Sequence, residues 1–152
     1  MPTARRTRTL PVAIESVWEV VADPHHLPRW WPGVKRMEGV GPEAWTEVHL
    51  TKKGRAVRVD FRLLESEDPD TREDGRARRA WEQEIEGTPF ERVLDESITE
   101  ITLEPAGAGT AVTLERRQRL RGASRIGGGM MLKRATAKRL NEALDELERI
   151  CG

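Results

Sequence analysis

Two periodicities of apolar residues divide the chain into helical and extended segments. Residues 5–10 read as a strand. A helix is predicted over residues 13–22, where apolar residues recur at i, i+3, i+4 and i+7: Ile14, Val17, Trp18 and Val21. Further along, the period changes to two, which is typical of strands with one buried face. Six strands are predicted there, between turns rich in glycine, proline and charge: residues 34–40, 45–50, 57–63, 77–85, 97–103 and 112–120.

The helical period returns over residues 124–150, a segment long enough to cross the predicted sheet. Its apolar stripe is formed by Leu132, Ala135, Leu140, Ala143, Leu144, Leu147 and Ile150. A strongly curved sheet around one long helix is an economical way to bury both apolar surfaces. The sequence therefore predicts one α+β domain over residues 1–152. Its curved antiparallel sheet has about six or seven strands, with two short helices after the first strand and a long C-terminal helix.

A pair of tryptophans follows a predicted helix cap. Asp23 can cap a short helix with Pro24 in its first turn, and Trp30 and Trp31 share one side of that helix. Large aromatic side chains usually pack in a core, and we expect this of at least one of Trp30, Trp31 and Trp81. The alternative is that Trp30 or Trp31 closes the mouth of a cavity and stacks on a planar ligand.

Polar side chains interrupt the inward faces of the last three predicted strands. They are Arg79 and Gln83 beside Trp81, then Ser97 and Thr99, and then Arg116 and Gln118. Buried polar groups are unfavourable unless they find partners. Several on one face therefore indicate either a wet cavity or strand ends from which the arginine heads reach water.

Three glycines, residues 127–129, precede Met130 and Met131 near the start of the last helix. Glycine inside a helix costs about 1 kcal/mol relative to alanine. The segment is therefore predicted in one of two forms. It is either a loose, methionine-lined turn over the cavity mouth, or a simple loop with the helix beginning at Met130.

Composition excludes several function classes. The 26 basic and 26 acidic residues give a net charge of zero, which argues against nucleic acid or an anionic membrane as the partner. Cys151 is the single cysteine and cannot form an internal disulfide, which favours a reducing cytoplasm. No apolar run approaches the ~20 residues needed to span a bilayer. No nucleophile motif such as Gly-x-Ser-x-Gly is present.

The titratable residues argue against a metal site or a paired-acid mechanism. His25 and His26 are adjacent and point to different sides of a helix, and His49 is predicted to face outward. Strand carboxylates fall mainly on the outward phase: Asp60, Glu82, Glu84, Glu100, Glu104 and Glu115. An arginine run favours a solvated face over an RNA surface: Arg116, Arg117, Arg119, Arg121 and Arg125. We expect no metal and no cofactor.

The order of elements and three segments resemble the START-like (SRPBCC) superfamily, and within it the bacterial polyketide cyclase/dehydrase and lipid-transport group. The segments are residues 11–18, residues 23–33 with the paired tryptophans, and residues 137–147. The resemblance implies a helix-grip fold with a ligand cavity between the sheet and the C-terminal helix. The superfamily includes aromatase/cyclases, plant ligand carriers, coenzyme-Q-binding proteins and ribosome-associated toxins, so fold alone does not choose a function.

Residues and resemblance together predict a cytoplasmic domain, monomeric or homodimeric, that binds a hydrophobic small molecule such as a lipid, a quinone or a polyketide. The predicted ligand-binding residues are Trp30, Trp31, Phe61, Arg79, Trp81, Gln83, Ser97, Thr99, Gln118 and Met131. One alternative is a polyketide aromatase/cyclase or dehydratase in which Arg79 polarises a carbonyl. The chain has no tyrosine, so such a site would lack a phenol. A second alternative is a ribosome- or RNA-associated interaction module.

Overall fold

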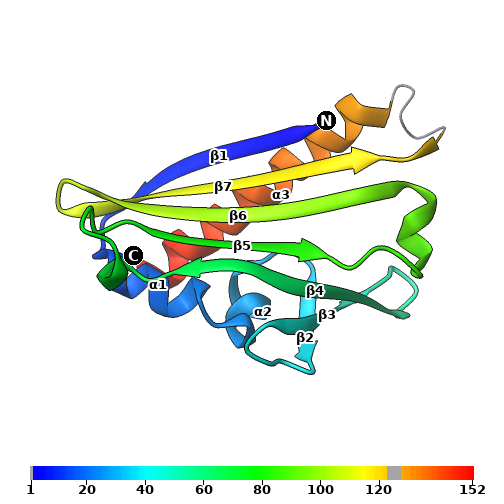
Figure 1. The fold of residues 1–152 in the computed structure, drawn as a ribbon, viewed down its shortest axis with the longest axis horizontal. Coiled ribbons are helices and arrows are strands. Elements are labelled where there is room, and N and C mark those ends of the chain that lie inside the picture. Colours follow the sequence, from blue (N-terminus) through cyan, green and yellow to red (C-terminus); the bar gives the residue numbers. More distant parts are fainter. Residues whose placement is uncertain (1, 123–127) are drawn as a thin grey trace.

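Strands and one long helix dominate the computed structural model, which describes residues 2–122 and 128–152 (Figure 1). The strands are β1 (Thr3–Leu10), β2 (Val34–Glu38), β3 (Ala44–Leu50), β4 (Ala56–Glu67), β5 (Ala77–Gln83), β6 (Leu94–Ala106) and β7 (Gly109–Leu120). The helices are α1 (Ile14–Val21), α2 (Leu27–Trp30) and α3 (Gly128–Cys151), with short 3₁₀ turns η1 (Pro24–His26), η2 (Pro69–Thr71) and η3 (Pro89–Arg92).

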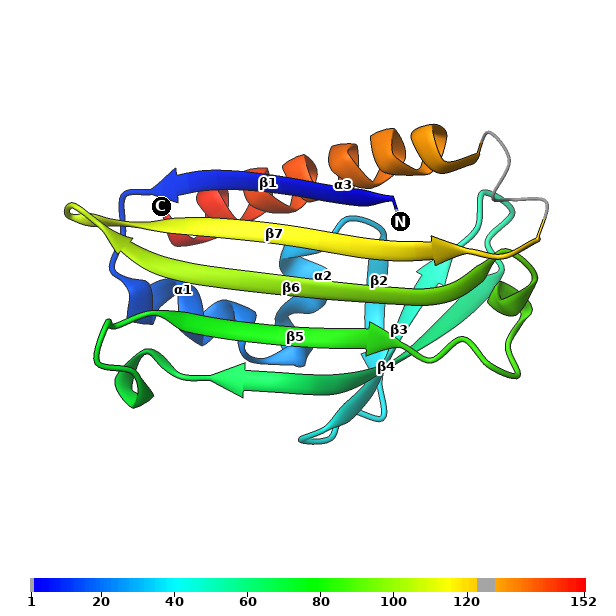
Figure 2. The same ribbon diagram turned by 45° about the horizontal axis from the view of Figure 1, so that its top comes forward.

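The seven strands form one antiparallel sheet in the order β1-β7-β6-β5-β4-β3-β2 (Figure 2). Consecutive strands from β2 to β7 are neighbours, and β1 forms one edge of the sheet, where it pairs with β7. This confirms the predicted curved meander. Strands β4 and β6 are longer than their alternating patterns indicated, because register shifts between Leu63 and Glu65 and between Leu94 and Glu96 break the period of two.

Helix α3 crosses one face of the sheet and packs against β1 and β7. Its buried side chains are Thr136, Ala137, Leu140, Ala143, Leu144 and Leu147, which confirms most of the predicted stripe. Ala135 was predicted in that stripe but is exposed, because the buried face runs through Thr136 and Ala137 instead. The helix includes Gly128 and Gly129, so the alternative in which it begins at Met130 was wrong; residues 124–127 lie outside the described residues.

The segment between β1 and β2 covers another part of the same sheet face. Helix α1 buries Ile14, Val17 and Val21 and packs on β6 and β7, while α2 packs on β2 and α3. The predicted cap is present, since the side chain of Asp23 accepts a hydrogen bond from the backbone N–H of His25. A second apolar cluster, formed by Ile85, Leu94 and Leu120 with Phe90 and Leu132, closes the end of the sheet near the start of α3.

The start of β7 lies very close to the end of β1, at Gly109 and Leu10. A Cβ added to Gly109 would come well inside 3.0 Å of the carbonyl oxygen of Leu10, a backbone atom held in the β1–β7 ladder. Gly109→Ala is therefore expected to destabilise the fold by about 1–3 kcal/mol in urea unfolding followed by circular dichroism. Gly41→Ala is the matched control, because its Cβ would meet the Ala44 carbonyl oxygen at an ordinary 3.6 Å. Equal losses in both variants would contradict this reasoning.

Candidate functional site

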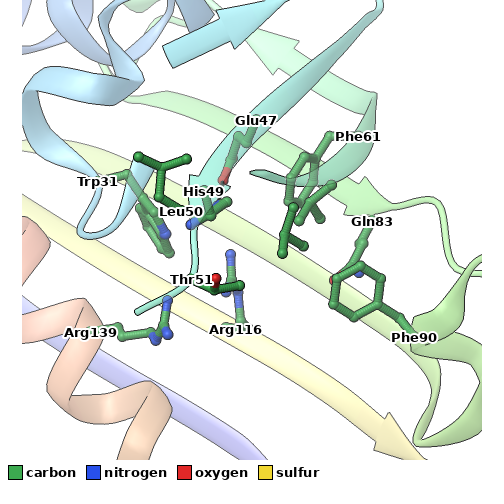
Figure 3. Close-up of a pocket in the computed structure, with 12 residues that line it drawn as sticks. Trp31, Glu47, His49, Leu50, Thr51, Phe61, Gln83, Phe90, Arg116 and Arg139 are labelled. Carbon is green, nitrogen blue, oxygen red and sulfur yellow. Dashed lines mark hydrogen bonds and ion pairs between the residues drawn. The ribbon is translucent and has the colours of Figure 1, made fainter. Parts of the chain in front are cut away.

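A pocket of about 280 Å³ opens on the inward face of the sheet, between β3, β4 and β5 on one side and β7 and α3 on the other (Figure 3). This volume is just below the ~300–1,000 Å³ that is usual for small-molecule sites. The lining residues are Trp31, Glu47, His49, Leu50, Thr51, Val57, Val59, Phe61, Gln83, Phe90, Arg116 and Arg139.

Two other hollows, of about 390 and 360 Å³, lie between the turn after α2 and the outer side of α3. Both are lined by Pro32, Gly33 and Glu142, and the larger is also lined by Val34 of β2. They are surface grooves along the helix. The pocket in Figure 3 instead receives inward side chains from four strands, which makes it the better candidate for a binding site.

Strand β3 sends a run of alternate side chains into the interior: Trp45, Glu47 and His49. The prediction that His49 faces outward was therefore wrong. It assumed that the apolar Val48 marks the inward phase, and Val48 is indeed fully buried, but on the other face of the sheet. There its cross-strand neighbours Arg36 and Arg58 both bond to Glu38, forming an ion-pair cluster beside it. The apolar character of Val48 therefore led to the wrong face being predicted for His49.

Glu47, which is buried, and His49, which is half-buried, form an acid–imidazole pair in this pocket. Glu47 is only 3% exposed, and its Oε1 lies 3.0 Å from Nε2 of His49. A carboxylate only accepts hydrogen bonds, so the imidazole donates from Nε2 and its Nδ1 is left as the second polar atom. Glu47 was not among the predicted site residues. Its place two residues after Trp45 on an alternating strand was the available signal.

Arg116 brings a positive charge from β7 into the pocket. Its Nε donates to Oγ1 of Thr99 at 2.7 Å, and its guanidinium lies 4.7 Å from the centre of the Trp31 ring. Loss of water around the group lowers the pKa of Arg116 to about 10; Glu47 acts in the opposite direction, and Arg139 lowers it further. The side chain is still charged at neutral pH, at an energetic cost.

Arg139 reaches the same pocket from α3, where its side chain is exposed at the edge. The turn at Gly33 leaves room for this approach. Gly33 has φ +85°, and a Cβ there would come within 3.2 Å of Nδ1 of His49 and 4.0 Å of Nη1 of Arg139. Glycine is therefore suited to this position both by backbone conformation and by space.

Arg79, a predicted ligand-binding residue and the best candidate for a catalytic role in the cyclase alternative, lies apart from this pocket. It is 7% exposed, its guanidinium lies 5.5 Å from the centre of the Trp45 ring, and its Nη1 donates to Oγ of Ser66 at 3.2 Å. With Trp81 it lines a small void of about 10 Å³ near α1 and α2. Desolvation lowers the pKa of Arg79, and Asp23 opposes that shift. The residue is inward, as expected, but its immediate surroundings leave little space for a ligand.

Three predicted ligand-binding residues instead take part in structural hydrogen bonds. Gln118 donates to Ser97 at 3.3 Å and accepts from Thr136 of α3 at 3.2 Å, and all three side chains are buried. Thr99 accepts from Arg116. None of Ser97, Thr99 and Gln118 lines the pocket. The bond between Gln118 and Thr136 joins α3 to the sheet, whereas the other two bonds lie within the sheet.

The remaining predicted residues divide among the core, the pocket and the surface. Trp30 is 1% exposed and packs edge-on against Trp31, with ring centres 5.5 Å apart, so of the two it is Trp31 that faces the pocket. Phe61 and Gln83 line the pocket as expected. Met131 is 76% exposed and does not line it.

The strand charges lie mostly on the outer face of the sheet, as expected. Arg117, Arg119 and Arg121 form ion pairs with Glu115, Glu96 and Asp95, respectively. Arg125 lies outside the described residues. An RNA-binding role for this run stays a prediction, and the paired carboxylates reduce the positive potential on which it would depend.

Two further observations concern the described residues as a whole. No helix within residues 2–122 and 128–152 is long and apolar enough to cross a membrane. In the same part of the chain, no group of three or more histidine, cysteine or acidic side chains is arranged to hold a metal ion.

A curved antiparallel sheet around one long helix, with a pocket between them, defines a START-like ligand-binding domain. The chain belongs to the family described as polyketide cyclase / dehydrase and lipid transport, whose model matches residues 1–152. A comparison with curated proteins finds no match.

Solved structures share this fold over nearly the whole chain. A START superfamily protein from Mycobacterium smegmatis has a TM-score of 0.70 at 11% identity, covering 98% of this chain and 96% of the other. TTHA0849 from Thermus thermophilus has a TM-score of 0.70 at 24% identity, covering 97% and 95%. BexL, a di-domain ARO/CYC from the BE-7585A biosynthetic pathway, has a TM-score of 0.73 at 24% identity, covering 98% of this chain and 46% of that one. At these identities the likeness shows the fold alone.

Removing the charge of Arg116 should stabilise the empty protein. Arg116→Met is expected to raise the melting temperature by roughly 2–4 °C, because folding no longer takes an unpaired guanidinium out of water. Differential scanning calorimetry gives the measurement. The matched control is Arg117→Met, which alters an outward, ion-paired neighbour and should change stability by less than about 0.5 kcal/mol. A lower melting temperature for Arg116→Met would show that its contacts with Thr99 and Trp31 outweigh the desolvation.

Proposed function

We propose that the protein binds a hydrophobic or aromatic small molecule, of the lipid, quinone or polyketide kind, in the pocket between β3, β4, β5 and α3. The observation that carries this proposal is the side-chain amide of Gln83. Its Nε2 is buried and has no hydrogen-bond partner among the described residues, yet Gln83 lines the pocket. A buried donor without an acceptor is unfavourable, and an oxygen atom of a ligand would satisfy it.

The surroundings of Gln83 support an apolar ligand body. Phe61 and Phe90 lie beside it in Figure 3. Val57 and Val59 of β4 also line the pocket. The indole N–H groups of Trp30 and Trp45 also lack a hydrogen-bond partner within residues 2–122 and 128–152, but neither residue lines this pocket. An apolar wall with a few convergent polar groups is the usual composition of a small-molecule site.

Filling the pocket should block binding. The neutral dye N-phenyl-1-naphthylamine fluoresces on entering apolar sites, and we expect the wild-type protein to bind it. Val59→Trp, which projects into the pocket, should weaken binding at least roughly tenfold, because the bulk of the indole occupies ligand space. Leu64→Trp is the matched control on the same strand, where Leu64 is 40% exposed and outside the lining. Absence of dye binding by the folded wild type, or equal binding by Val59→Trp, would contradict the proposal.

Native mass spectrometry of the purified protein, beside a denatured sample, addresses the identity of the ligand. A mass present only in the native spectrum would be a bound molecule, and its composition would separate lipid, quinone and polyketide.

A second candidate function is cyclisation or dehydration of a polyketide. The observation that favours it is the Glu47–His49 pair in the same pocket as Arg116. A histidine oriented by a carboxylate can accept a proton from carbon, and a nearby cation stabilises the oxyanion that develops. The carbonyl-polarising role predicted for Arg79 would fall to Arg116, which lines the pocket.

Turnover tests this second candidate. If aromatic polyketide precursors are cyclised, His49→Phe should lower kcat by roughly 10²–10⁴-fold, as expected for loss of a general base, while dye binding persists. His25→Phe is the control, since His25 is exposed and outside the pocket. Liquid chromatography with mass detection follows the products. Unchanged kcat in His49→Phe would remove this residue from the mechanism.

A further inference from the structure

The charged side chains that line the pocket do not cancel. Arg116 and Arg139 contribute two guanidinium groups, while Glu47 contributes one carboxylate, which also bonds to His49. One positive charge is therefore in excess even when Glu47 is ionised. A charge held away from water is unfavourable unless a counter-charge accompanies it.

This imbalance distinguishes the pocket from the outer face of the sheet. There, many arginines bond directly to carboxylates, as Arg62 does to Glu82 and Arg78 to Glu100. Within residues 2–122 and 128–152, neither Arg116 nor Arg139 forms an ion pair. The two cations that face the pocket thus lack the partners that outward arginines have.

Resting on the ligand-binding function proposed above, we propose that the ligand is an anion: an aromatic or polycyclic molecule whose carboxylate, or a similarly acidic oxygen group, lies against Arg116 with Arg139 at the edge of the pocket. The apolar body then lies toward Phe61 and Phe90, and Gln83 donates to a second oxygen.

The geometry of Arg116 fits this role. A guanidinium has five N–H donors in a planar fork, and Arg116 uses one of them, on Nε, for Thr99. Neither Nη atom forms a hydrogen bond with a described residue. The ring of Trp31 lies 4.7 Å from the guanidinium carbon, which restricts its orientation before a ligand arrives. A held fork with free donors is suited to bidentate recognition of a carboxylate.

Isothermal titration calorimetry with two isosteric probes tests the proposal. 2-Naphthoate and 2-naphthamide have the same rings and nearly the same size, and differ in the charge of one group. We expect the wild-type protein to bind 2-naphthoate at least roughly tenfold more tightly, as is typical of hydrogen bonds to charged groups. Acetate carries the charge without the rings and should bind far more weakly than 2-naphthoate.

Single substitutions test which arginine provides the preference for 2-naphthoate. Arg116→Met should abolish the preference for 2-naphthoate over 2-naphthamide, and Arg139→Gln should reduce that preference partially. Arg134→Gln is the control, because Arg134 is an exposed cation on the same helix and does not line the pocket. Circular dichroism confirms folding of each variant before titration.

The outcomes separate this inference from the function on which it rests. Equal affinity for the two naphthyl probes would overturn the anion preference but leave the binding function intact. Failure of both to bind would overturn both. Acetate binding as tight as 2-naphthoate would show a simple anion site, and a preference retained in Arg116→Met would show that this arginine does not provide it; either result overturns the inference.

Discussion

A mismatch in width determines the arrangement of this molecule: a single helix is narrower than the sheet on which it packs. Leu140, Leu144 and Leu147 of α3 are fully buried, and the helix packs on β1 and β7. A helix with its side chains is about 10–12 Å wide. Seven strands spaced about 4.8 Å apart are about 30 Å across. Helices α1 and α2 cover part of the difference, and the pocket lies where β3, β4 and β5 face no helix of comparable length.

Inward polar groups in this protein serve two distinct purposes. The chain of Ser97, Gln118 and Thr136 is internally satisfied and fixes α3 to the sheet. Gln83 and Arg116, by contrast, retain donors that no described residue accepts. The first group supports a specific position of the helix, because a displaced helix would leave buried polar atoms unpaired. The second group is unfavourable in the empty protein, and under the proposed function a ligand would satisfy it, which is a common relation between stability and function.

The fold followed from the sequence because periodicity reports directly on burial, and the periods of two and 3.6 are long and clear here. The site was less accessible. The phase of β3 depended on Val48, whose burial on the opposite face beside an Arg–Glu cluster has no signature in a single sequence. Arg79 and Arg116 were both correctly placed inward. Which of them meets open space depends on how α2 and α3 pack, and that is decided by contacts distant in sequence.

The aromatic composition has a practical consequence. The chain contains five tryptophans and no tyrosine. Trp31 lies against Arg116 and lines the pocket. The other four do not line it: Trp18, Trp30, Trp45 and Trp81. A ligand that draws the guanidinium away from the Trp31 indole changes its electrostatic surroundings, and indole emission depends strongly on nearby charge. Ultraviolet fluorescence of the unlabelled protein therefore contains a built-in signal from the pocket, free of any tyrosine background.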